Sequence, residues 1–198
     1  MIGNLFNIVQ GDKLKLNIGC GFNKIDGFIN IDKFDECKPD LKMDAEITPW
    51  LFNENEIDEV FFIHSLEHMG ADANVFFAII KELYRVCKPG AIINIKVPHP
   101  RHDDFINDPT HVRIITPELF SLFSKKENIR WKDELASNSL LALYLDVDFE
   151  IKENRMLVEP KYMELFNNKE ISEDDLNELI KECNNIAKEY ELTLKVIK

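Results

Sequence analysis

Two glycines separated by one residue follow a short run of alternating apolar and polar side chains near the start of the chain. The run, residues 14–18, predicts a strand, and Gly19 and Gly21 come directly after it. Without a Cβ, the backbone of such a turn can pass close to a ligand, and its N–H groups can donate to carboxylate or phosphate oxygens. An ordinary glycine-rich turn can have the same sequence, so a second feature of the chain is needed to assign a binding role to this motif.

A carboxylate ends the next predicted strand. Residues 28–31 form a short β-prone run that lies between Gly27 and Asp32. In nucleotide-binding α/β folds, a carboxylate in this place accepts hydrogen bonds from both hydroxyls of a ribose. Only eleven positions separate Gly21 from Asp32, whereas a dinucleotide-binding fold has its acid about 20 residues on. The spacing disfavours an NAD enzyme and predicts a first helix of about one turn.

All five histidines fall within one quarter of the chain. They are His64, His68, His99, His102 and His111. An imidazole near pH 7 can accept a proton from a hydroxyl, and we take His111 as the first candidate for such a base and His99 as the second. A polar surface loop or a divalent-metal site would also account for these residues.

The same stretch carries charges that could recognise a ligand. Arg101 and Arg113 lie close together in an acidic chain, which favours recognition of an anionic group such as a phosphate, a carboxylate or a nucleotide-linked sugar. We assign both, with Asp104, to substrate binding. The alternative is that the arginines only neutralise nearby aspartates.

Residues 64–68 read His-Ser-Leu-Glu-His, which matches the H-x-x-E-H pattern of a class of zinc proteases. That pattern needs a helix with both histidines on one face. Here the run follows a predicted buried strand, and Gly70 comes almost at once. A zinc-dependent hydrolase is therefore kept as an alternative function, and the preferred interpretation assigns no metal.

The elements that must position these residues alternate between strands and helices. Predicted strands cover residues 14–18, 28–31, 41–43, 59–63, 91–97, 149–158 and 192–197. Apolar residues recur at helical spacing over 75–87, after Asp72 and before a Lys-Pro-Gly stop. Further helices are predicted to start at Thr116 and Ser172. This order is typical of a parallel α/β sheet, with an antiparallel strand expected at the C-terminus.

Length and composition restrict the class of protein. A chain of 198 residues with 45% hydrophobic residues fits one domain, 1–198, in which residues 98–116 form an active-site loop. The net charge of −12 disfavours nucleic acid and anionic membranes as partners. Four scattered cysteines, no recognisable signal peptide and no apolar run of membrane-spanning length predict a cytoplasmic protein.

Five segments, in order and with consistent spacing, resemble the class I S-adenosylmethionine-dependent methyltransferases, most closely a compact small-molecule subset. They are LNIGCG (16–21), GFINID (27–32), MDA (43–45), HSLEH (64–68) and LYRVCKPGA (83–91). Two positions depart from the pattern, because many members have an acid where Asn17 stands and a third glycine where Asn23 stands. The resemblance implies a Rossmann-like, mostly parallel seven-stranded sheet with helices on both faces.

The resemblance also implies a cofactor, S-adenosyl-L-methionine, and the residues that bind it. Gly19 and Gly21 would line its methionine part, Asp32 would hold the ribose, Asp44 with Ala45 would face the adenine, and His64 and Ser65 would flank the sulfonium and the acceptor. The expected reaction is methyl transfer to a small polar acceptor, anionic or sugar-like, with oxygen preferred over nitrogen. A cofactor-binding protein without turnover is a further alternative.

Overall fold

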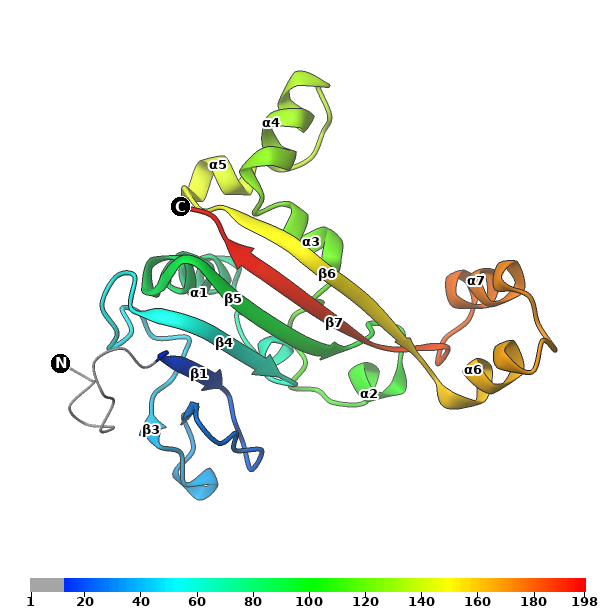
Figure 1. Ribbon diagram of the computed structural model, residues 1–198, viewed down its shortest axis with the longest axis horizontal. Helices are drawn as coiled ribbons and strands as arrows, with labels where there is room; N and C mark the ends of the chain where they lie inside the picture. The colour runs from blue at the N-terminus through cyan, green and yellow to red at the C-terminus, as the bar shows by residue number, and fades with distance from the viewer. Residues whose placement is uncertain (1–12) are drawn as a thin grey trace.

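Seven strands form the central sheet of the protein, for which a computed structural model describes residues 13–198 (Figure 1). The strands are β1 (Lys15–Ile18), β2 (Ile29–Asp32), β3 (Leu41–Lys42), β4 (Ile57–Ile63), β5 (Cys87–Pro98), β6 (Phe149–Val158) and β7 (Ala187–Val196). Their order in the sheet is β3-β2-β1-β4-β5-β7-β6. Strands β1 to β5 pair in parallel, and β7 is antiparallel to both of its neighbours. The predicted mostly parallel sheet with an antiparallel C-terminal strand is confirmed.

The strands alternate between a fully buried face and a half-buried one. Val60 and Phe62 in β4, and Ile93 and Ile95 in β5, are almost completely buried. Full burial of such a side chain is worth about 1.5–3 kcal/mol, so this face supplies much of the stability. These residues belong to one apolar cluster that also includes the inner side chains of helix α1 (Ala73–Val86).

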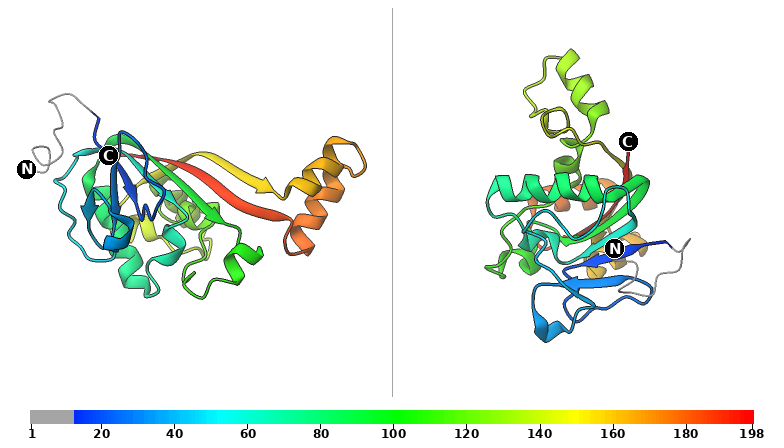
Figure 2. Two further views of the ribbon diagram at one scale, coloured as in Figure 1. Left: turned by 90° about the horizontal axis from the view of Figure 1, so that it is seen from below. Right: turned by 90° about the vertical axis from the view of Figure 1, so that its left-hand side faces the viewer.

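The connecting helices are distributed unevenly. They are α1, α2 (Asp103–Ile106), α3 (Pro117–Ser121), α4 (Lys125–Asp133) and α5 (Leu141–Leu145), and they gather on one side of the sheet (Figure 2). On the opposite side, Phe61, Ile63 and Asn94 are half-buried. In the described chain, β1 is joined to β2 by a loop without a helix.

The predicted helix starts agree with the observed caps. The Asp72 side chain accepts a hydrogen bond from the Asn74 N–H at the start of α1, and the Thr116 side chain does the same for Leu119 at the start of α3. Ser172 forms a reciprocal capping box with Asp175 at the start of α7 (Glu173–Glu182). Each such cap is worth about 1 kcal/mol.

Strands β6 and β7 extend beyond the rest of the sheet as a long hairpin. Helices α6 (Pro160–Asn167) and α7 lie at its far end, away from the other helices (Figures 1 and 2). The pairing of β7 with β5 places Glu189 opposite Pro98, at the end of β5. The hairpin thus brings a residue from near the C-terminus to the edge where the parallel strands end. Within residues 13–198, no helix has both the length and the apolar character needed to cross a membrane.

Candidate active site

A cavity of about 420 Å³ opens where β1, β2 and β4 end. Because carboxyl ends of parallel strands meet at one edge of a sheet, residues far apart in the sequence line it together. The lining includes the seven residues that the sequence analysis assigns to a cofactor, namely Gly19, Gly21, Asp32, Asp44, Ala45, His64 and Ser65. It also includes residues without a predicted role, among them Phe34, Met43, His68 and Thr110.

The two glycines of the first turn are required for different reasons. Gly19 has φ +69°, and a Cβ at this position would lie 2.5 Å from the Cβ of Ser65. Gly21 has φ +50°, and a Cβ there would meet no atom within 4 Å. Gly19 therefore allows the ends of β1 and β4 to approach each other, whereas Gly21 leaves open space on the cavity side of the turn. The hydroxyl of Ser65 donates to the Ile18 carbonyl at 2.7 Å and fixes the same approach.

Asp32 is a buried carboxylate whose orientation is fixed by two backbone donors. The Gly21 N–H donates to its Oδ2 at 2.8 Å, and the Phe34 N–H donates to its Oδ1 at 2.9 Å. A carboxylate oxygen can accept two hydrogen bonds, so each oxygen keeps one free site. The two free sites match a pair of neighbouring hydroxyl groups.

A network of polar side chains holds the loop between β1 and β2 in place of the expected helical turn. The buried amide of Asn17 donates to the Asn23 carbonyl at 2.8 Å and to Asn30 Oδ1 at 2.9 Å. Asn30 in turn donates to Asp40 Oδ2 at 2.7 Å and accepts from the Ile25 N–H at 2.8 Å. The Asn17 amide thus has a structural role in this loop.

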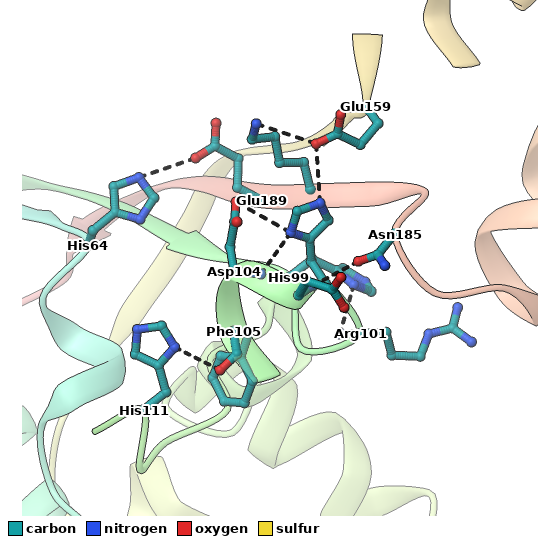
Figure 3. Close-up of polar contacts among 12 residues, drawn as sticks. His64, His99, Arg101, Asp104, Phe105, His111, Glu159, Asn185 and Glu189 are labelled. Carbon is teal, nitrogen blue, oxygen red and sulfur yellow. Dashed lines mark hydrogen bonds and ion pairs between the residues drawn. The ribbon is translucent and has the colours of Figure 1, made fainter. Parts of the chain in front are cut away.

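His64 begins the opposite wall of the cavity, directly after β4. It has φ +50°, a left-handed conformation that costs a non-glycine residue about 1–3 kcal/mol and is common at functional sites. Its Nε2 lies 3.3 Å from Glu189 Oε2 (Figure 3). Its Nδ1 lies 3.8 Å from Glu67 Oε1. Burial is the main cause that lowers the pKa of this imidazole.

Glu67 is the most unusual charged group of the site. Its residue is only 1% exposed, and neither carboxylate oxygen has a hydrogen-bond partner. Burial raises the pKa of this carboxyl to about 7. Its backbone carbonyl accepts from the N–H groups of Val112 and Arg113 at 2.9 and 3.0 Å, which ties the segment after β4 to the loop that carries His111.

Two further imidazoles lie beside Glu67. The rings of His68 and His111 are 4.5 Å apart, and His111 Nε2 lies 4.0 Å from Glu67 Oε1. His111 Nδ1 is 2.9 Å from the Phe105 carbonyl (Figure 3), and His68 Nδ1 is 2.9 Å from Thr110 Oγ1. The loop 98–116 therefore brings His111, the first candidate base, next to the cavity wall.

His99, the second candidate base, is held outside the cavity lining. It is buried, its Nδ1 accepts from the Arg101 N–H at 3.2 Å, and its ring lies 5.1 Å from that of Tyr190. Asp104 is exposed, with a carboxylate oxygen 3.3 Å from His102 Nδ1. Neither residue faces the cavity as the sequence analysis expects.

The two arginines assigned to the substrate have other partners. The guanidinium of Arg101 donates to the carbonyls of Ile180 and Lys181 in the last turn of α7. The guanidinium of Arg113 donates to the Gly70 carbonyl and lies 4.7 Å above the ring of Phe76. Both contacts join elements of the fold. Neither arginine lines the cavity or pairs with an aspartate of the loop within the described chain.

The structure adds residues that the sequence analysis did not select. Glu67 and His68 belong to the H-x-x-E-H match, but nothing in the sequence indicates that they lie next to His111. Glu189 carried no local signal, because only the β5–β7 pairing brings it to the site. The protease geometry itself is not formed, since His64 follows a strand and His68 ends a three-residue 3-10 turn, η3 (Leu66–His68). These two histidines do not share the face of one helix.

Comparisons with known proteins were made by sequence and by structure. No family model matches the chain, and no curated protein matches it. A SAM-dependent methyltransferase from Archaeoglobus fulgidus is similar in structure, with a TM-score of 0.61, 21% identity, and coverage of 98% of this chain and 90% of that one.

Two further solved structures widen the comparison. Phosphoethanolamine N-methyltransferase 2 from Haemonchus contortus, in complex with S-adenosyl-L-methionine, has a TM-score of 0.54 at 14% identity, and the match covers 100% of this chain and 51% of that one. The cyclase SpnF has a TM-score of 0.54 at 17% identity, with coverage of 96% of this chain and 77% of that one. The chain has the Rossmann-like fold of the class I methyltransferases.

Proposed function

We propose that the chain is an S-adenosylmethionine-dependent methyltransferase that acts on a small polar acceptor, with oxygen preferred over nitrogen. The observation that carries the proposal is the cavity on this fold, where the Gly19–Gly21 turn, the Asp32 carboxylate and Asp44 line one space. We further propose that residues 1–198 act as one domain, in which the loop 98–116 borders the acceptor.

The cofactor half of the cavity fits the group in shape and in hydrogen bonding. Gly21 leaves open the space that a Cβ would fill, and Asp32 keeps two acceptor sites directed by backbone donors. The Asp44 carboxylate is oriented by the Glu46 N–H at 3.0 Å, and the Ala45 carbonyl is held by the Trp50 indole at 3.0 Å. We propose that Asp32 binds the ribose hydroxyls and that Asp44 and Ala45 face the adenine.

The acceptor half has groups that can orient a hydroxyl and take up its proton. When bound, the cofactor supplies an activated methyl group on a sulfonium, so the chain must mainly position the acceptor in line. His64 lines the cavity, and its two ring nitrogens lie near the carboxylates of Glu67 and Glu189. His111 lies beside Glu67. We propose that these imidazoles are the proton acceptors, with His111 as the first residue to test.

The charged residues around the cavity favour one chemical class of acceptor over others. Glu67, Glu189 and Asp108 approach the acceptor half, whereas Arg101 and Arg113 are bound elsewhere. This arrangement supports a neutral, hydroxylated, sugar-like acceptor over a phosphate or a carboxylate. The net charge of −12 likewise supports a small molecule over nucleic acid.

The cyclase SpnF gives a specific reason to keep a second candidate. It shares this fold, and its name describes a reaction that is not methyl transfer. A fold therefore does not fix the reaction. The second candidate is a protein that binds the cofactor in the same cavity without transferring its methyl group.

An assay for methyl transfer separates the two candidates. The purified chain is incubated with S-adenosylmethionine and a panel of sugar-like alcohols, amines and carboxylates, and S-adenosylhomocysteine is measured. We expect acceptor-dependent product with a hydroxylated compound, and none with the Gly21→Val variant. Cofactor binding without turnover on any acceptor would favour the second candidate, and the absence of cofactor binding would contradict both.

A further inference from the structure

The Glu67 carboxylate lacks a partner that a buried charge requires. Among the described residues, it is the one buried side-chain carboxylate with both oxygens free of hydrogen bonds. An isolated carboxylate buried in protein costs several kcal/mol, and buried charges are normally paired or bound to a metal. Arg113, whose Nε is also buried without a partner, directs its guanidinium to Gly70 rather than to this carboxylate. The fold therefore buries this carboxyl group without supplying a hydrogen-bond donor to either oxygen.

The hydrogen bonds of the two neighbouring histidines leave a lone pair free on each ring. The Phe105 carbonyl can only accept, so Nδ1 of His111 must donate. The Thr110 hydroxyl donates to Asp108 Oδ1 at 2.6 Å, so it accepts from Nδ1 of His68. In both rings, Nε2 is then the nitrogen that can bind a cation. Metal-binding histidines are commonly held in this way, with the second nitrogen hydrogen-bonded to a neighbouring group.

We propose that Glu67, His68 and His111 bind one divalent transition-metal ion, for which Zn²⁺ has the best-suited chemistry. One ligand atom from each residue lies within 4.8 Å of the other two. His111 Nε2 and Glu67 Oε1 are 4.0 Å apart, and ligand atoms each about 2 Å from one zinc ion lie within about 4 Å of each other. Small side-chain movements would thus complete the site.

The backbone holds the two ligand-bearing segments together without the ion. Glu67 and His68 belong to the turn η3 after β4, and His111 comes from the loop after α2. The hydrogen bonds from Val112 and Arg113 to the Glu67 carbonyl connect the two segments. Two imidazoles and one carboxylate with an open position form a donor set typical of a catalytic zinc site, and nitrogen donors disfavour Mg²⁺.

The site adjoins the cavity, because His68 and Thr110 belong to the cavity lining. An ion held there could bind an acceptor oxygen at its open position. With the ion bound, His111 would be a ligand and not a proton acceptor, and His64, which lies outside the ligand set, would be the imidazole left to accept the proton. This inference goes beyond the proposed function and does not depend on it, because the three ligands are argued from their own contacts.

The test is a calorimetric titration of the chelator-treated full chain with ZnCl₂, with MgCl₂ as the comparison. We expect one zinc ion per chain and much weaker binding of magnesium. Glu67→Gln and His111→Ala are each expected to weaken zinc binding by at least roughly a hundredfold, since each removes a ligand, and loss of a group that merely hydrogen-bonds a ligand already costs about 10- to 100-fold. His102→Asn is the matched control: it removes an imidazole outside the cluster, retains a side chain that can cap α2, and is expected to bind zinc like the parent.

Circular dichroism and the binding of S-adenosylhomocysteine show whether each variant is folded. If Glu67→Gln does not fold, His68→Ala and His111→Ala provide the test. Zinc binding that is equally strong in these variants would place the ion elsewhere, for example at the exposed Cys183, and would overturn the proposal. The absence of zinc binding to the parent, or a preference for magnesium, would overturn it as well.

Discussion

The two walls of the cavity differ in how their buried polar groups are satisfied. On the wall formed by β1 and β2, Asn30 has hydrogen bonds to Asn17 and Asp40, and both oxygens of Asp32 accept backbone donors. On the wall formed by the segment after β4 and the loop 98–116, the carboxylate of Glu67 has none. The polar groups named on the first wall have hydrogen-bond partners without a ligand, whereas the Glu67 carboxylate on the second wall has none.

This difference indicates different tasks. Polar groups fixed by backbone donors form a preorganised site, which reduces the entropy lost when a ligand of fixed shape binds. A buried carboxylate without a donor, next to two imidazoles with free nitrogens, instead has an affinity for a cation or a proton. We infer that the first wall binds a constant ligand and the second carries the chemistry on the acceptor.

Loss of His111 is expected to have the largest effect on turnover. It should also distinguish the two walls most clearly, because turnover should fall while cofactor affinity is kept. His111→Ala should lower turnover by about a hundredfold, the range for loss of a group that accepts a proton or orients the acceptor. Affinity for S-adenosylhomocysteine should stay within a few fold, because His111 does not line the cavity. Steady-state kinetics and calorimetry measure the two quantities. His99→Ala, which alters a ring packed on Tyr190, should lower turnover less; the reverse order would assign the role to His99.

Substitution of Gly21 should damage the first wall selectively. Gly21→Val places a branched side chain in open cavity space and should weaken S-adenosylhomocysteine binding by roughly a hundredfold, about 2.7 kcal/mol. Gly27→Val is the matched control, because Gly27 also has positive φ (+78°) with no atom within 4 Å of a Cβ, but does not line the cavity. Both variants should lose similar stability through backbone strain. Equal loss of binding in the two variants would show that strain alone explains the result.

Loss of the Asp32 carboxylate should have a smaller effect on binding. Asp32→Ala removes hydrogen bonds from a charged acceptor to two hydroxyls, worth about 1.5–3 kcal/mol, or roughly ten- to a hundredfold in affinity. Asp26→Ala, an exposed carboxylate of the same loop, is the control and should bind as the parent does. If calorimetry shows no difference between the two variants, the ribose contact is misassigned.

The smallest expected effect concerns stability without metal. Glu67→Gln should leave the melting temperature of the metal-free protein at or above that of the parent, because the carboxylate has no partner to lose. Asn30→Ala should instead cost about 1–3 kcal/mol, since it leaves buried partners unpaired. Thermal unfolding with chelator compares the two. A large loss in Glu67→Gln would reveal a partner for this carboxylate and would remove the difference between the walls.

The strands, and the convergence of residues on the first wall, were predictable because they depend on local patterns and one topological rule. Alternation over residues 14–18 and the buried run 59–63 indicate strands, and carboxyl ends of parallel strands must converge. The segment between Gly21 and Asp32 was predicted to contain a helix of about one turn, but the structure has no helix there. The polar network in its place depends on Asp40, which only the folded chain brings to Asn30.

The second wall was less predictable because its contacts are long-range. Arg101 appeared free to bind an anion, but it binds carbonyls of α7, which the β6–β7 hairpin brings to it. Glu189 reaches His64 only through the pairing of β7 with β5. Glu67 could not be recognised as an unpartnered charge, because burial and hydrogen bonding around a side chain are properties of the folded chain. Short helices such as α5 and α6 lack a periodic apolar pattern long enough to detect.

The central claim is that the first wall, together with Asp44 and Ala45, binds the cofactor without a metal ion. Its most direct test is a calorimetric titration of the chelator-treated chain with S-adenosylhomocysteine. We predict binding of one molecule per chain, the same with and without chelator, and strongly weakened in Gly21→Val but not in Gly27→Val. No binding to the parent, or binding that disappears with the chelator, would contradict the account.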